Sequence, residues 1–172
     1  MKKIFAALLG LTVAMLAQAQ NGGFQNGDKL LNLGIGVNSY YDKGIPFGAS
    51  FEAGITDAIS IGGNVDYLSS KYASDFKFTA LYVAARGSYH FNELLKITNE
   101  KVDVYAGVTL GYRAFSWKND YNNGGLGNSY GSGIFLGGYA GARYYFGTGI
   151  GAFAELGAIG STNARLGVAF KF

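Results

Sequence analysis

The stretch "ARLGVAFKF", residues 164–172, alternates between apolar and polar or small side chains up to the last residue of the sequence. The apolar positions are Ala164, Leu166, Val168, Phe170 and Phe172. A period of two is typical of a β-strand with one apolar face. The last residues of a domain are poorly ordered unless something holds them. The pattern therefore predicts a terminal strand that pairs with another part of the chain.

Residues 1–19 have the features of an export signal. Two lysines at 2–3 precede an apolar run over 4–16, and the small-residue triplet "AQA" follows at 17–19. The run is shorter than the roughly 20 residues that a membrane-spanning helix needs. We predict cleavage before residue 20, which leaves 20–172 as a single domain.

The composition excludes several classes of protein. The 14 Lys and Arg exceed the 11 Asp and Glu by three, and two of these cations lie in the predicted signal, so nothing argues for nucleic acid. The chain has no cysteine, which excludes disulfides and thiolate metal sites. The 28 glycines and 16% aromatic residues are typical of β-barrels.

The alternation recurs along the chain and predicts eight strands. These are 31–38, 47–55, 59–67, 81–91, 102–113, 134–146, 152–158 and 164–172. Eight strands fit membrane strands of roughly 9 to 11 residues with their connections. The longest predicted loop is 116–133, rich in Asn and Gly. We predict an all-β, eight-stranded antiparallel up-and-down transmembrane barrel in which 164–172 pairs with 30–38.

Charged residues fall on the face that such a barrel turns inward. They are Glu52, Asp66, Arg86, Arg113, Arg143, Glu155 and Arg165. A membrane barrel turns its apolar face to lipid and its polar face to the lumen. We predict a lower layer of Glu52, Arg86, Arg143 and Glu155, with Arg143 beside Glu155 across the 147–151 turn. Asp66, Arg113 and Arg165 are expected to form a second cluster nearer the outer rim.

Aromatic residues end several of the predicted strands on the outward face. Tyr89, Phe91, Tyr144 and Phe146 are predicted to form a girdle at one membrane interface, together with the terminal phenylalanines. Tyr67, Tyr112 and Trp117 are candidates for a girdle at the opposite rim.

The strand ends "AARGSYHF" at 84–91, "GARYYF" at 141–146, "GAFAELG" at 151–157 and "ARLGVAFKF" at 164–172 resemble those of a known family. It is the family of small eight-stranded bacterial outer-membrane barrels, similar to outer membrane protein X and to the barrel domain of outer membrane protein A. We predict a monomer in the lipid of the bacterial outer membrane. The resemblance implies recognition of Leu166, Val168, Phe170 and Phe172 by the barrel assembly machinery.

Several functional hypotheses remain open. The favoured one is a charge-paired, plugged lumen with surface-exposed loops in a structural or adhesion role, without catalysis, cofactor or metal. The alternatives are a narrow pore for ions or small solutes and a soluble, exported lipocalin-like binding barrel. His90, the only histidine, would need a nucleophile and an orienting group to act in catalysis, and the sequence identifies neither. The loop 116–133 could bind an unknown surface ligand.

Overall fold

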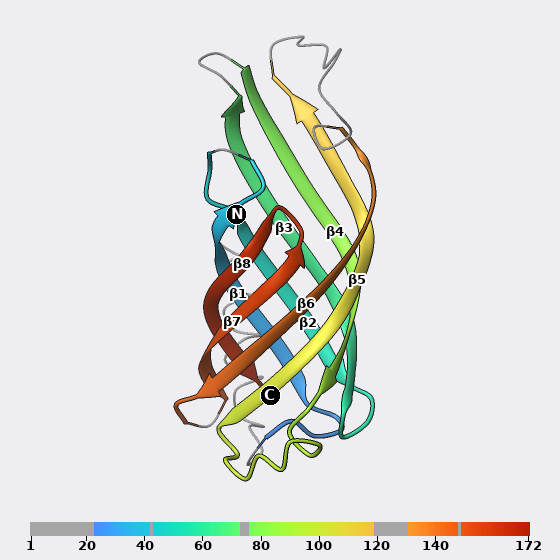
Figure 1. Cartoon of the computed structure of the whole chain (residues 1–172), viewed down its shortest axis with the longest axis vertical. Coiled ribbons are helices and arrows are strands. Elements are labelled where there is room, and N and C mark those ends of the chain that lie inside the picture. The colour runs from blue at the N-terminus through green and yellow to red at the C-terminus, as the bar shows by residue number, and fades with distance from the viewer. Residues whose placement is uncertain (1–22, 42, 73–75, 119–130, 148) are drawn as a thin grey trace, which may run out of the picture.

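The computed structural model describes residues 23–41, 43–72, 76–118, 131–147 and 149–172. The predicted signal segment and much of the longest predicted loop lie outside these residues. The described chain forms eight strands (Figure 1). They are β1 (Lys29–Ser39), β2 (Phe47–Gly54), β3 (Ile59–Tyr72), β4 (Phe76–His90), β5 (Val102–Trp117), β6 (Gly133–Tyr145), β7 (Ile150–Ile159) and β8 (Thr162–Lys171). No helix in the described ranges is long and apolar enough to cross a membrane.

The strands close into one barrel in which each pairs antiparallel with its neighbours in sequence. β8 returns to β1, and Leu30 pairs with Lys171 at one end of this seam. Beyond the seam, the backbone N–H groups of Lys29 and Phe172 each donate to the other residue's carbonyl oxygen, at 2.9 and 3.0 Å. The predicted barrel and its closure by the last strand are confirmed.

The barrel has a terminal end, where β1 begins and β8 finishes, and a distal end opposite to it. β3, β4 and β5 reach much further at the distal end than the β7–β8 hairpin does (Figure 1). β2 pairs with β3 only as far as Tyr67, whereas the β3–β4 ladder continues to the pair Tyr72 and Phe76.

This extension corrects the predicted loop at 69–75 and the predicted start of the longest loop at 116. Residues 68–71 and 77–80 continue the alternation, but their outward side chains are polar where the outward face of the other strands is apolar. The inward residues Leu68, Phe78 and Ala80 are buried together. The polar outward residues make this part of the sequence look like a loop. The β3–β4 ladder nevertheless continues, because its inward residues still pack together.

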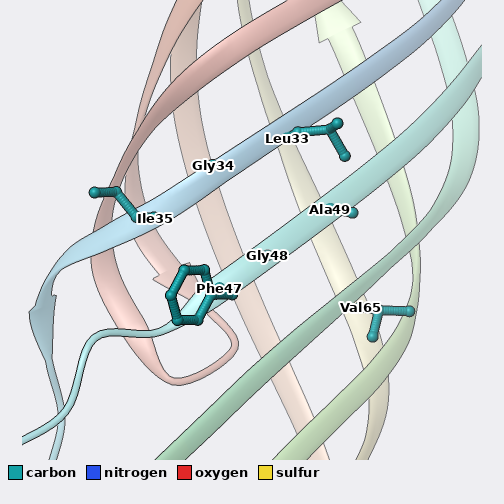
Figure 2. A pocket seen from close by; sticks show the side chains of 7 residues that line it. All are labelled: Leu33, Gly34, Ile35, Phe47, Gly48, Ala49 and Val65. Carbon is teal, nitrogen blue, oxygen red and sulfur yellow. The ribbon is translucent and has the colours of Figure 1, made fainter.

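The apolar face points outward, as predicted. Ile61 is 53% exposed and Leu136 is 75% exposed, while Glu52, Arg143 and Glu155 are at most 1% exposed in the interior. Figure 2 shows part of the outer face, where Leu33, Ile35 and Phe47 border an open apolar groove of about 460 Å³ over β1, β2 and β3. A water-soluble barrel would have the opposite arrangement.

The predicted girdle rings lie on the outer surface near the terminal end. Tyr89 and Phe91 are in edge contact with ring centroids 4.9 Å apart, and Tyr144 and Phe146 are 5.8 Å apart. The proposal for Trp117 at the other rim is wrong. Its ring packs inward against Phe78 at a centroid distance of 5.5 Å, because the added length of β5 places it on the inner face.

Candidate functional site

The candidate site is the charged interior of the barrel. All seven charged residues predicted for the lumen lie on inward positions of their strands, and six of them are buried, Arg113 being partly exposed. A charge removed from water is costly unless it is paired and hydrogen-bonded. The partners of each charged group therefore define what the interior can do.

Glu52 lies at the centre of the lower layer. Its Oε1 atom is 3.3 Å from Nη2 of Arg86 and 3.1 Å from Nη2 of Arg143. Arg86 also pairs with Oε1 of Glu155 at 2.7 Å, and Arg143 pairs with Oδ2 of Asp103 at 2.7 Å. The four predicted residues thus lie in one network, which Asp103 extends.

The predicted pairing of Arg143 with Glu155 across the β6–β7 turn is wrong. Tyr145 pairs with Gly151, so Arg143 lies opposite Phe153 and Glu155 lies opposite Gly141. The hairpin is centred one residue earlier than its glycines suggest. The long side chains therefore find partners across the lumen rather than along the hairpin.

Asp103 was not among the predicted lumen charges, although it falls within the predicted strand 102–113. Asp103 is two positions before Tyr105, so the same alternation, extended by one step, would have found it. It is 1% exposed and contacts both Arg143 and His90.

Uncharged side chains complete the lower layer. Ser60 and Ser88 donate hydrogen bonds to Oε2 of Glu52, and the Tyr105 hydroxyl donates to Oε1 of Glu155 at 2.9 Å. The guanidinium of Arg143 lies over the Tyr105 ring, 3.9 Å from its centroid. Stacking on an aromatic face suits the planar, weakly hydrated guanidinium. The layer is therefore held by hydrogen bonds and ring contacts as well as by charge.

Asp66 and Arg165 form a separate pair closer to the distal end. Nη2 of Arg165 is 2.6 Å from Oδ2 of Asp66 and also donates to the carbonyl oxygen of Ile159 at 3.1 Å. Arg113, predicted to join this cluster, donates instead to the carbonyl oxygen of Gly131 at 2.7 Å. Tyr82 lies between Asp66 and Arg113 in the strand register.

An aromatic cluster lies in the distal interior. Its buried core contains Tyr41, Phe78 and Tyr82, with Phe115, Trp117 and Phe135 packed against it. The hydroxyl oxygens of Tyr41 and Tyr82 are 2.9 Å apart, and burial raises the pKa of Tyr41 above its ordinary value. Toward the distal end, apolar contacts therefore replace ion pairs in the interior of the barrel.

The segment 23–28 covers the terminal end of the lumen. The Phe24 ring stacks on the imidazole of His90, with centroids 3.4 Å apart and planes 4° from parallel. Lys171 donates to the carbonyl oxygen of Gly23 at 2.8 Å and lies 3.8 Å from the Asp28 carboxylate. Burial raises the pKa of Asp28, an effect that the nearby Lys171 ammonium partly offsets.

His90 lies between a carboxylate and a hydroxyl. Its Nδ1 atom is 2.7 Å from Oδ1 of Asp103 and its Nε2 atom is 3.0 Å from Oγ of Ser60. These are the residue types of a serine hydrolase triad, and the sequence did not identify the two partners. Ser60 is 0% exposed and also donates to Glu52 at 2.9 Å. A substrate therefore has no access to the Ser60 hydroxyl in this structure.

Metal ligation receives no support from the described part of the chain. No group of three or more His, Cys, Asp or Glu residues there is placed to hold a metal ion. The carboxylates of the lower layer instead face arginines, which occupy the positions that a cation would take.

No family model matches the chain, and no curated protein matches it. Several solved structures are similar. The outer membrane protein OprG from Pseudomonas aeruginosa has a TM-score of 0.58 and 14% identity, covering 89% of this chain and 99% of that one. Ail, the attachment invasion locus protein of Yersinia pestis, has a TM-score of 0.52 and 13% identity, covering 86% of this chain and 100% of that one. The N-terminal β-barrel domain of Pseudomonas aeruginosa OprF has a TM-score of 0.52 and 18% identity, covering 86% of this chain and 98% of that one. The predicted resemblance to small eight-stranded outer-membrane barrels is thus confirmed at the level of the fold.

Proposed function

We propose that this chain is an integral outer-membrane barrel with a closed lumen, which presents its distal end at the cell surface in a structural or interaction role without catalysis. The observation that carries the proposal is the inverted distribution of side chains. Exposed apolar residues surround the barrel, and paired charges fill it. Only a hydrocarbon solvent makes this arrangement favourable over the apolar band of the outer face.

The predicted export signal and the resemblance to outer-membrane barrels support the location. In this setting the terminal end, where β1 begins and β8 finishes, faces the periplasm. The outward pairs Leu166 with Ile35 and Val168 with Leu33 then lie in the bilayer. We further propose that the barrel assembly machinery reads Leu166, Val168, Phe170 and Phe172.

The closed lumen is supported by three successive layers. The segment 23–28 lies at the terminal end, the network around Glu52 lies next, and the aromatic cluster around Phe78 fills the distal interior. An eight-stranded barrel has an interior just wide enough for its own side chains to fill. The same layers bury Ser60, which is the reason to favour a role without catalysis.

An interaction role is supported by the extension of β3, β4 and β5. β3 continues past its last pair with β2, and β5 continues past its last pair with β6, while β4 lies between them. Loops held by a rigid scaffold commonly carry binding functions. The loop residues 119–130, which we predicted as a ligand-binding candidate, lie outside the described residues.

The test is outer-membrane fractionation followed by electrophoresis with and without heating. We expect the protein in the outer-membrane fraction and a different mobility for the unheated, folded form. Recovery in the soluble fraction without detergent would instead support an exported, soluble binding barrel.

A variant pair sharpens this test. Leu110→Arg places a charge on the middle of the outer face, where it should destabilise a bilayer-embedded barrel by about 2–4 kcal/mol. Ser116→Arg places the same charge on the same strand near the distal end and should be tolerated. Equal folded fractions for the two variants would argue against a bilayer around β5.

A further inference from the structure

Three lysines form a row across the outer face of the distal extension. Lys71 on β3 pairs directly with Lys77 on β4. The backbone N–H of Lys118 donates to the carbonyl oxygen of Lys77 at 2.8 Å, which continues the β4–β5 ladder beyond the pair Phe78 and Trp117. All three lysines are exposed, and they alternate with inward residues of their strands. Neighbouring strands are about 4.8 Å apart, so the three side chains begin within about 10 Å of one another.

The row lies at a definite height above the apolar band. Below it on the outer face is a row of hydroxyl side chains, Ser69, Thr79 and Ser116, and below that the row of Tyr67, Leu81 and Ala114. Lys71 lies four positions beyond Tyr67, which is about 13 Å along a strand and about 10 Å along the axis of a tilted barrel. The headgroup layer of a bilayer is roughly 5 to 7 Å thick on each side. Lysine stems at this height can reach back into that layer.

A bound anion would offset the repulsion between the ammonium groups of the row. Like charges placed directly opposite each other on a sheet are destabilising. Most of the described carboxylates are buried in the barrel, and Asp57, Glu93 and Glu100 lie in connections at the terminal end. Asp42, Asp75 and Asp120 lie outside the described residues. The described outer face at the distal end therefore presents cations, and Lys43, in the connection after β1, adds a fourth.

We propose that Lys71, Lys77 and Lys118 bind the phosphate groups of an anionic lipid in the outer leaflet. This inference rests on the proposed function, because it requires the distal end to emerge from that leaflet. Lysine ammoniums are strongly hydrated point charges on flexible stems, which suits phosphates in a mobile lipid surface. A row of three across adjacent strands would engage neighbouring phosphates together and fix the height of the barrel.

The experiment compares lipid binding by folded variants. The protein is folded in nonionic detergent micelles and titrated with fluorescently labelled diphosphoryl lipid A, followed by anisotropy. A basic residue near an anionic surface contributes about fivefold in affinity. The triple variant Lys71→Gln, Lys77→Gln, Lys118→Gln should therefore bind on the order of 100-fold more weakly. The same lipid without its phosphates should bind wild type and variant equally.

The matched control removes the same charge from the other end. Lys29, Lys96 and Lys101 are exposed near the terminal end, and their triple replacement by Gln should leave the affinity unchanged within about twofold. Equal losses in the two triple variants would overturn the proposal, since net charge alone would then explain binding. Unchanged affinity in the distal variant would overturn it as well.

Failure of this inference can be separated from failure of the proposed function. A separate sample of each protein is inserted into phosphatidylcholine vesicles and checked for its heat-dependent mobility. If wild type does not insert, the proposed function is wrong and this inference falls with it. If wild type inserts but binds phosphorylated and dephosphorylated lipid equally, only the lysine row is contradicted.

Discussion

At the scale of single residues, the interior depends on charges that share partners. Arg143 contacts Glu52 at 3.1 Å and Asp103 at 2.7 Å, and it is 1% exposed. Removing this cation leaves two buried carboxylates short of a partner. Arg143→Met should therefore lower the free energy of unfolding by about 3–5 kcal/mol. Urea titration of the protein folded in vesicles measures this loss.

Lys101→Met is the control for that substitution, because Lys101 is exposed in the connection between β4 and β5. Its effect should stay within about 0.5 kcal/mol. Comparable losses in the two variants would show that Arg143 does not hold the network together.

Gly48 makes room for a buried guanidinium. A Cβ atom added at Gly48 would collide with the Arg165 side chain, which pairs with Asp66 at 2.6 Å. Gly48→Ala should therefore displace that pair and cost about 1–3 kcal/mol of stability, again measured by urea titration. Gly133→Ala is the matched control, since nothing lies within 4 Å of a Cβ added there. A greater loss for the control would contradict the packing argument.

The sequence could predict which residues face the lumen but not how they pair. Period-two alternation places Glu52, Arg86 and Glu155 inside from local information alone. The pairing of Arg86 with Glu155 joins β4 to β7 across the barrel, and it depends on register and strand stagger. A shift of one residue in the centre of the β6–β7 turn was enough to give Arg143 the wrong predicted partner.

At the scale of elements, β8 closes the barrel against β1. Phe172 forms two backbone hydrogen bonds with Lys29 just beyond the strand. Its deletion removes this last pair and, on our proposal, part of a signal for the barrel assembly machinery. We expect less folded protein in the outer membrane, measured as the heat-modifiable fraction, while any binding at the distal end persists in the protein that does fold.

Phe146→Ala is the control for the deletion. Phe146 is an exposed ring of the predicted girdle near the same end of the barrel, but it is not at the chain terminus. The Phe146→Ala variant should assemble at a near wild-type level. Normal assembly of the Phe172 deletion would remove the assembly role of this residue.

The segment 23–28 shields the only histidine. Phe24 stacks on His90 at 3.4 Å, and His90 is 2% exposed. Phe24→Ala should expose the imidazole to diethyl pyrocarbonate, and mass spectrometry should then detect modification of His90 in the variant well before it does in wild type. Leu94→Ala, at a side chain that is 66% exposed, should change nothing. Rapid modification of wild type would show that the segment does not cover the lumen.

The length of β3, β4 and β5 was the main element-level feature that the sequence concealed. Beyond Tyr67 the outward residues become Ser69 and Lys71, so the apolar stripe that identifies a membrane strand disappears. The inward residues Leu68 and Phe78 still pack. A stretch of sequence taken as a whole, with both faces of the strand together, nevertheless looks mainly polar there. The change from apolar to polar outward residues therefore marks a change of solvent rather than the end of a strand.

At the scale of the whole molecule, the layered interior predicts a barrel that carries no sustained ionic current. Wild type reconstituted in planar bilayers should show no single-channel steps, because on our proposal the paired side chains of the lower layer close the lumen. The double variant Arg86→Ser, Glu155→Ser removes one cation and one anion, so it keeps the net charge while opening space in the lower layer. It should conduct if that layer is the seal. Steps from folded wild type would support the pore alternative, and a silent double variant would place the seal in the aromatic cluster or the segment 23–28.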